Sequence, residues 1–366
     1  MDFKLSKEHE MARKMFREFA ENELEPLAVE IDEEERFPWE SVEKFARYGM
    51  MGIPIPKKYG GAGGDNLMYC IAIEEISKKC ATSSVIVAAH TSLCMGPIMA
   101  FGTEEQKMKW IPDLASGRKI GAFGLTEPGA GTDASGQQTM AVKDGDEYVL
   151  NGTKCFITNG DTASTYVVFA VTDKTKGLKG ISLFVVEKGT PGFSTGLHEK
   201  KMGIRGSSTT DLIFEDCRIP AGNLIGKEGQ GWKICMHTLN GARAGVAAQA
   251  LGIGEGALDL AMKYVQERMQ FKKKLSKFQR TQFEIADMHT KLEAGKLLVY
   301  SAACKEDAYN KGDKTQNYAM DSAMAKLFCG EAASDVTRRC VQLFGGYGYI
   351  REYQVERMMR DAKITE

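Results

Sequence analysis

The sequence lacks the cysteine and histidine spacings that hold a disulfide framework or a metal ion. Its nine cysteines are odd in number and scattered, and no two are spaced as Cys-x-x-Cys. Its five histidines are isolated, and none falls in a His-Glu-x-x-His pair. We therefore expect most cysteines to be small buried side chains, and we expect no metal site.

An excess of charge of one sign is also lacking. The 366 residues carry a formal net charge of -1 at pH 7, which gives no electrostatic footprint for nucleic acid or for an anionic membrane. No uninterrupted apolar run approaches the ~20 residues of a membrane span. The acidic, helix-patterned amino terminus resembles neither a secretory signal nor a transit peptide. These absences predict a cytoplasmic protein with no membrane span and no nucleic-acid partner.

Motifs for nucleotide binding and for nucleophilic acyl transfer are missing as well. The segment GIGEGA, residues 252–257, lies inside a helical pattern, and GNLIGKE, residues 222–228, lacks the spacing and the hydroxyl residue of a P-loop. Strands and helices do not alternate as in a dinucleotide-binding fold, and there is no Gly-x-Ser-x-Gly turn. Any anionic ligand must therefore be held by a few placed groups.

What the sequence does contain is a hydrophobic periodicity that changes from helix to strand and back. The first part is helical, with Ser6 as a cap and one apolar stripe formed by Met11, Met15, Phe16 and Phe19. Short alternating runs follow, with Asp144-Gly145 and Asn151-Gly152 as predicted two-residue turns of an antiparallel β domain. Helical patterns then return over residues 231–267, 276–311 and 317–345. We predict an α+β fold with domains 1–118, 119–228 and 229–366.

The segment FGLTEPGAGTD, residues 123–133, lies where the first helical block meets the β domain. Thr126, Thr132 and Asp133 supply polar side chains, while Gly129 and Gly131 let backbone amides approach a ligand closely. Taken alone, the segment fits a ligand-binding loop and an ordinary surface turn equally well.

Five segments together decide between these interpretations: FGLTEPGAGTD, KCFITNG (154–160), MGIRGS (202–207), VQLFGGYGY (341–349) and RDAKI (360–364). In this order and spacing the chain resembles the acyl-CoA dehydrogenases, and most of all the short-chain, butyryl-CoA branch. The resemblance runs from the first residue to the last. It implies an amino-terminal helical domain, a central antiparallel β domain and a carboxy-terminal helical bundle.

The resemblance also implies FAD, bound between the β domain and the last helical domain. Its ligands in the same chain would be Phe123, Leu125, Thr126, Gly131, Thr132, Phe156 and Thr158. An aromatic side chain at 156 can cover a flavin face, and a hydroxyl at 158 can bond near N5. A neighbouring subunit would complete the site with Arg268, Gln279, Gln342, Leu343, Phe344, Gly345 and Gly346. A homotetramer, built as a dimer of dimers, follows from this sharing.

The acyl-CoA thioester would be bound by Thr132 and by the segment NGAR, residues 240–243. Arg243 matches the family arginine that meets the CoA phosphates, while Asn240 replaces a frequent aspartate and loses its charge. Three lysines, 272–274, stand where the family usually has Gly-Lys-Pro. This lysine run is either a solvated face or a changed loop near the neighbouring flavin. Glutaryl-CoA specificity is disfavoured, because the register of its carboxylate-binding arginine falls at Ser84.

The catalytic base is not assigned to a residue of this chain. Removing the α proton of a thioester needs a carboxylate within hydrogen-bond reach, and the resemblance places that glutamate three residues after Glu366. The other base position known in the family is Ala242, which cannot serve. Glu366 itself is offset from the base position, so we expect the sequence to be part of a longer enzyme.

The leading hypothesis is therefore a dehydrogenase that passes electrons from a short acyl-CoA to an electron-transferring flavoprotein. The reverse direction, enoyl-CoA reduction coupled to electron bifurcation, uses the same residues and stays open. A hypothesis from a different class is a non-catalytic scaffold that binds flavin or acyl-CoA, which holds if Glu366 is the true terminus.

Overall fold

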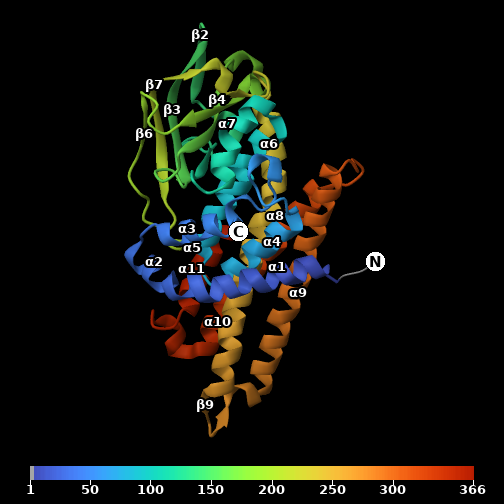
Figure 1. Ribbon diagram of the computed structural model, residues 1–366. Coiled ribbons are helices and arrows are strands. Elements are labelled where there is room, and N and C mark those ends of the chain that lie inside the picture. Colours follow the sequence, from blue (N-terminus) through green and yellow to red (C-terminus); the bar gives the residue numbers. More distant parts are fainter. Residues whose placement is uncertain (1–3) are drawn as a thin grey trace.

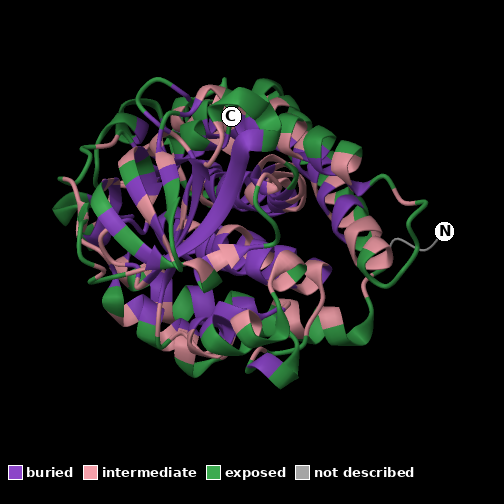
Figure 2. Ribbon diagram, turned by 90° about the horizontal axis from the view of Figure 1, so that it is seen from above, coloured by how far each residue is buried: buried purple, intermediate pink, exposed green. Residues whose placement is uncertain are grey.

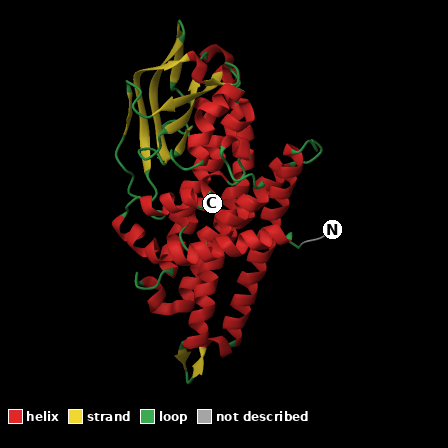
Figure 3. Cartoon of the chain, in the orientation of Figure 1, coloured by secondary structure: helices red, strands yellow, loops and turns green. Residues whose placement is uncertain are grey.

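A helical block, a β-sheet and a second helical block follow one another along the chain in the computed structural model, which describes residues 4–366. Figure 3 shows the strands gathered at one end of the molecule, with helices beside and below them. The predicted order of helical, β and helical domains is thereby confirmed. The first three residues of the predicted amino-terminal domain lie outside the described residues.

The first block consists of α1 (Lys7–Phe19), α2 (Ala28–Glu34), α3 (Trp39–Arg47), α4 (Asn66–Ser77), α5 (Ala81–Ala88), α6 (Gly96–Phe101) and α7 (Glu104–Ala115). Ser6 caps α1, as predicted, because its hydroxyl accepts the His9 backbone N–H. The predicted apolar stripe is only half right: Phe16 and Phe19 are buried, but Met11 and Met15 are exposed. The strip of α1 that faces α4 also carries arginines that pair with the buried Glu75, so the methionines point to the surface.

A long apolar helix crosses the middle of this block. It runs through α5, a π-helical stretch Ala89–Met95 and α6. Its length of 21 residues and mean hydropathy of 1.6 would suffice for a membrane span, but 61% of its most apolar window is buried inside the protein. This is the pattern of a core helix, and the part of the chain that the structure describes has no other candidate span.

The sheet holds β1 (Gly121–Gly124), β2 (Met140–Asp144), β3 (Glu147–Thr158), β4 (Thr165–Val171), β5 (Ile181–Glu187), β6 (Phe193–Thr195), β7 (Thr209–Pro220) and β8 (Leu224–Ile225). Its order is β6-β7-β3-β2-β4-β5-β8, with β1 paired to β4. Most neighbours are antiparallel, as predicted, while β1 and the start of β2 pair with β4 in parallel.

Of the two predicted turns, Asp144-Gly145 is displaced by one residue and Asn151-Gly152 is wrong. Asp144 pairs with Glu147, so the hairpin turns through Gly145 and Asp146. Asn151-Gly152 is not a turn, because β3 continues through it to Thr158. Gly152 has φ 144° beside a register shift at which β7 carries the extra residue, which marks a β-bulge in β7. The Asn-Gly pair therefore lies opposite a bulge and does not end β3.

The second helical block confirms the three predicted helices as α8 (Gly231–Glu267), α9 (Gln279–Asn310) and α10 (Tyr318–Phe344), and it adds α11 (Val355–Ala362). A small hairpin of β9 (Met269–Gln270) and β10 (Lys273–Lys274) joins α8 to α9 at the far end of the molecule (Figure 1). Its lysines are exposed.

The glycines of GIGEGA have a packing role in α8. A Cβ at Gly252 would lie 2.2 Å from the backbone oxygen of Glu74, and one at Gly256 would lie 2.3 Å from that of Lys78. These glycines let α8 cross the end of α4 at backbone contact. Figure 2 shows the resulting core of buried strands and helices inside a shell of exposed turns.

The cysteines behave mostly as predicted. Cys304 is exposed, and the other eight are free and buried. Residues 4–366 contain no group of histidine, cysteine and carboxylate side chains that could hold a metal ion.

Candidate active site

The loop that follows β1 is a tight turn with its glycines facing open space. Glu127 and Ala130 exchange backbone hydrogen bonds of 3.2 and 3.0 Å, and the Cys155 N–H donates to the Thr126 carbonyl at 2.9 Å. Nothing lies within 4 Å of where a Cβ would stand at Gly129 or Gly131. The loop is therefore fastened to β3 and offers approachable backbone on its outer side.

A buried ion pair holds this loop from behind. The Lys154 ammonium, fully buried, donates to Glu127 Oε1 at 2.7 Å, to the Leu125 carbonyl at 3.1 Å and to Gln137 Oε1 at 3.1 Å. Glu127 also accepts the backbone N–H of Gln138 and of Thr139. These bonds join both ends of the loop to β3.

The electrostatics of the pair follow from its burial. Burial lowers the pKa of Lys154 to about 8, although Glu127 opposes the shift. Burial raises the pKa of Glu127, but Lys154 and the Gln138 amide outweigh that effect and hold the pKa below its ordinary value. Both side chains are charged at neutral pH, so removing either one would leave a buried charge unpaired.

Near the end of β3 the backbone is strained at Phe156, where β3 carries an extra residue before its pairing with β7 resumes at Ile157. Phe156 has φ 57° and a side chain that is 64% exposed. Asn159, three residues on, also has a positive φ of 63° and is fixed by donating to the carbonyls of Ile86 and Gly121. Non-glycine residues rarely adopt this conformation, and it concentrates at functional sites. The strain turns an aromatic ring outward beside the half-buried Thr158.

These side chains fit a flavin. Phe156 offers a flat apolar ring, Thr126, Thr132 and Thr158 offer hydroxyls, and the glycines of the loop leave backbone amides within reach of a ligand. Leu125 is buried and Phe123 half-buried beneath them, where they support the loop. The structure thus places the predicted same-chain residues on β1, on the loop after it and on the end of β3, and their role as flavin ligands stays a prediction.

The second predicted set lies at the opposite end of the molecule. Arg268 and the run Gln342–Gly346 line one groove of about 510 Å³ at the base of the helical bundle, and the Arg268 guanidinium lies over the Tyr347 ring. Gln279, the first residue of α9, is near this end but does not line the groove. Figure 1 shows the β9 hairpin of this end and the sheet at the two extremes of the molecule. One chain alone cannot place both sets on one flavin.

Two of the predicted thioester residues, Asn240 and Arg243, lie on α8, and Thr132 lies in the loop after β1. Arg243 Nη1 donates to Asn240 Oδ1 at 2.6 Å, so the amide that replaces the family's carboxylate still orients the guanidinium. Both side chains are half-buried, and Thr132 is exposed. The bond keeps a cation available to an anionic ligand without an acid beside it.

Comparison with known proteins decides the family. Residues 6–118, 122–217 and 229–366 match the N-terminal, middle and C-terminal domains of acyl-CoA dehydrogenase. The chain belongs to the acyl-CoA dehydrogenase family. Members of this family are flavoprotein oxidoreductases that act on CH–CH groups, so the flavin-like geometry has its counterpart in the family.

Individual relatives resemble the chain over nearly their whole length. The chain is 58% identical to the short-chain specific acyl-CoA dehydrogenase of Clostridium acetobutylicum, over 100% of this chain and 95% of that protein. It is 53% identical to the acryloyl-CoA reductase (NADH) of Anaerotignum propionicum, over 100% and 92%. It superposes with TM-score 0.97 and 52% identity on a chain solved with the electron transferring flavoprotein of Acidaminococcus fermentans, covering 100% of this chain and 94% of that one.

Neither candidate base of this acyl-CoA dehydrogenase chain is suited to abstract a proton. Ala242 is buried and apolar. The Glu366 carboxylate pairs with Lys363, and this hydrogen bond lowers its pKa. The predicted base, three residues after Glu366, stays a prediction.

Sequence reasoning missed the Lys154–Glu127 pair. The sequence indicates only that a lysine occupies an inward-facing position in the alternating run TKCFI. It does not indicate that the partner of this lysine is Glu127, 27 residues earlier. The pairing needs the register of β3 against the loop, which only the fold supplies.

Proposed function

We propose that the protein catalyses FAD-dependent α,β-dehydrogenation of a short-chain acyl-CoA, or the reverse enoyl-CoA reduction. The observation that carries the proposal is the strained Phe156 beside Thr158, opposite a glycine loop held by Lys154. A bound flavin supplies the acceptor for the β hydrogen. The short-chain relative supports the size of the acyl group, and the reductase relative supports the reverse direction.

The chain's own residues bind and orient in this proposal. Phe156 covers one face of the flavin ring, while Thr126, Thr158 and the loop amides hold its polar edge. Arg243 binds the CoA phosphates, and Asn240 keeps its guanidinium in place. The α proton needs a carboxylate within hydrogen-bond reach, a role that neither Ala242 nor the Lys363-paired Glu366 fills.

A second copy completes the site. Arg268 and the run Gln342–Gly346 line one groove, and a guanidinium beside glycines suits a pyrophosphate. We therefore propose a homotetramer built as a dimer of dimers. The structural relative solved with an electron transferring flavoprotein supports such a protein as the redox partner. The cytoplasmic location stays a prediction.

The test uses protein whose sequence runs through the predicted base position. Purified protein should show the flavin absorption bands, and anaerobic butyryl-CoA should bleach them. Arg243→Ala should raise the half-bleaching concentration of butyryl-CoA about tenfold or more, because a charge-assisted contact is lost. The matched control is Arg218→Ala, which removes an exposed arginine of β7. Protein without flavin, or bound flavin that butyryl-CoA leaves unbleached, would contradict the proposal.

A further inference from the structure

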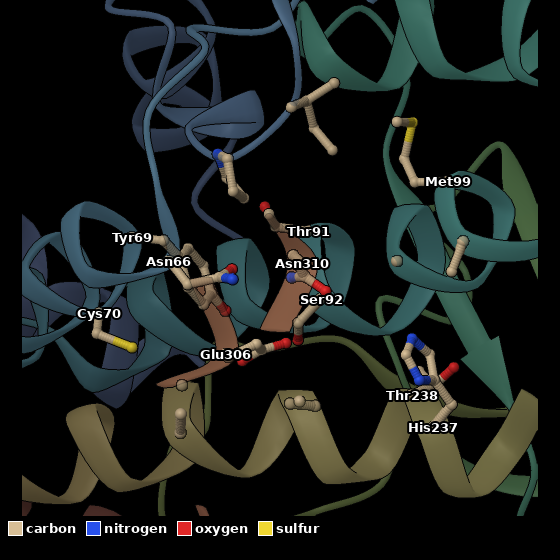
Figure 4. Close-up of a pocket in the computed structure, with 18 of the residues that line it drawn as sticks. Asn66, Tyr69, Cys70, Thr91, Ser92, Met99, His237, Thr238, Glu306 and Asn310 are labelled. Carbon is tan, nitrogen blue, oxygen red and sulfur yellow. The ribbon is translucent and has the colours of Figure 1, made fainter. Parts of the chain in front are cut away.

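A second cavity, of about 470 Å³, lies between α4, the π-helical stretch with α6, α8 and the end of α9. Figure 4 draws Tyr69, Ser92, Glu306 and His237 around it. Of the described residues that line it, none is a predicted flavin or acyl-CoA ligand, but one is Ala242, the other base position of the family. With about 100° of rotation per residue, Gly241 and Gly245 face this cavity while Asn240 and Arg243 project from roughly the opposite side of α8.

The acid of the cavity is Glu306, near the end of α9. Its carboxyl has no hydrogen bond and no ion pair to any residue in the described range 4–366. A Cβ at Gly241 would lie 2.5 Å from Glu306 Oε1, so only a glycine there leaves room for the carboxyl. Burial, and then the charge of Asp307, raise the pKa of Glu306 to about 7. An unpaired acid of this kind gains most from a cation.

The second polar group is the hydroxyl of Tyr69, a side chain of α4 that is 5% exposed. The hydroxyl is buried and has no hydrogen-bond partner, although Ser92 is beside it. Ser92 donates its own proton to the Ala88 carbonyl at 2.7 Å, which leaves its oxygen as an acceptor. A buried polar group without a partner costs free energy, which a ligand would recover.

The charge of the lining selects the ligand. No lysine or arginine lines the cavity, and burial keeps His237 neutral by lowering its pKa. An anion would therefore meet Glu306 with no compensating cation. The rest of the wall combines apolar side chains, among them Ile55 and Met99, with four neutral polar ones: Asn66, Thr91, Thr238 and Asn310.

We propose that this cavity binds a small organic ammonium ion, a primary amine on a short apolar body. The ammonium group donates to the Glu306 carboxylate and to the hydroxyl oxygens of Tyr69 and Ser92, and the alkyl body packs against Met99 and Ile55. An ammonium group has three N–H donors and one compact charge, which match the carboxylate and the two hydroxyl oxygens. The cavity adjoins the proposed acyl-CoA site at Ala242 and lies on the other side of α8 from Arg243.

The experiment measures binding of n-butylammonium to the whole flavoprotein by calorimetry at pH 8, with neutral n-butanol as the matched probe. Glu306→Gln keeps the shape and removes the charge, so it should weaken n-butylammonium at least about tenfold and leave n-butanol unchanged. The control Glu331→Gln removes an exposed acid of α10 and should change neither. No saturable binding to the wild type, or equal binding to Glu306→Gln, would overturn the proposal.

The pH profile of the wild type tests the proposal without a variant. The groups facing Glu306 are Asp307 on the same helix, Tyr69 and Cys70 on α4, His237 on α8 and Tyr318 on α10. Glu306 must lose its proton to pair with the cation. The affinity for n-butylammonium should therefore rise about tenfold per pH unit below pH 7 and level off above it.

A flat profile would overturn the proposal. Saturating butyryl-CoA should leave the affinity for n-butylammonium unchanged. Competition between the two would show that the cavity belongs to the acyl-CoA site, which would also overturn it.

Discussion

The backbone conformation of Phe156 lowers the stability of the protein and places the aromatic ring on the surface. A side chain held in the left-handed region costs about 1–2 kcal/mol, and a ring that is 64% exposed recovers little of this by burial in the chain itself. The cost is explained if the ring serves a ligand. The strain therefore predicts that replacing Phe156 with glycine stabilises the flavin-free protein but weakens its retention of flavin.

Phe156→Gly should raise the free energy of unfolding of the flavin-free protein by about 0.5–1 kcal/mol, because glycine relieves the strain while losing some entropy. The same change should weaken flavin retention, since the ring is gone. Urea unfolding and the flavin absorbance of the purified protein measure the two effects. Phe156→Ala is the control: it keeps the Cβ, so flavin should fall without the gain in stability. Full flavin retention by Phe156→Gly would contradict the assigned role.

His90 makes folding sensitive to acid. Its Nδ1 accepts the Gly121 N–H at 2.9 Å, its Nε2 donates to the Leu114 carbonyl at 3.1 Å, and burial lowers its pKa to about 4. Because this pKa lies below the ordinary value, the unfolded chain binds the proton first as pH falls below about 6.5. Stability from this group is complete above that pH and is lost as the pH falls toward 4.

His90→Gln keeps both hydrogen bonds and removes the titration. Between pH 7 and pH 5 the wild type should therefore lose about 2 kcal/mol more unfolding free energy than this variant. Urea unfolding at the two pH values measures the difference. The exposed His289 provides the control, since His289→Gln should keep the wild-type pH dependence. Equal pH dependence of the wild type and His90→Gln would show that His90 does not titrate in this way.

At the scale of elements, Gly152 lies in β3 beside a β-bulge of β7, four residues before the bulge of β3 that contains Phe156. A Cβ at Gly152 would lie 2.7 Å from the backbone Cα of Thr139, so the backbone itself would have to move. Gly145, in the hairpin turn, has a positive φ but nothing within 4 Å. The two glycines differ in crowding and also in φ, which is 61° at Gly145 and 144° at Gly152.

Gly152→Ala should destabilise the protein by about 2–3 kcal/mol, because it adds both strain and overlap. Gly145→Asn, the control, should cost less than about 1 kcal/mol, since asparagine tolerates this conformation in a turn. Thermal unfolding of the two variants provides the comparison. Equal losses would contradict the assignment of the bulge.

The long helices could be predicted from the sequence, but the bulge could not. Helical periodicity is local, so α8, α9 and α10 follow from the spacing of their apolar residues. Asn151-Gly152 carries the same local signal as a hairpin turn, and only the pairing of β3 with β7 shows that the strand continues. The Lys154–Glu127 pair could not be predicted from the sequence for the same reason. Residues of the flavin loop came from the resemblance, while their strain and support came from the fold.

At the scale of the whole molecule, the two predicted halves of the flavin site lie at opposite ends of one chain (Figure 1). Phe156 stands at the sheet, and Arg268 lines the groove at the base of the bundle. The account requires that the sheet of one copy meets the bundle end of another. An isolated chain would then bind flavin weakly, whatever the quality of its own half-site.

Mixing two defective variants tests this requirement most directly. Phe156→Asp damages the half-site at the sheet and Arg268→Ala damages the half-site at the bundle, so each variant assembled alone should retain little flavin. When the two are refolded together, random pairing gives about half mixed pairs, and each mixed pair has one intact site of two. Flavin content, read from absorbance, should recover to about a quarter of the wild-type value. Flavin no higher than the average of the two separate variants would contradict a site shared between copies.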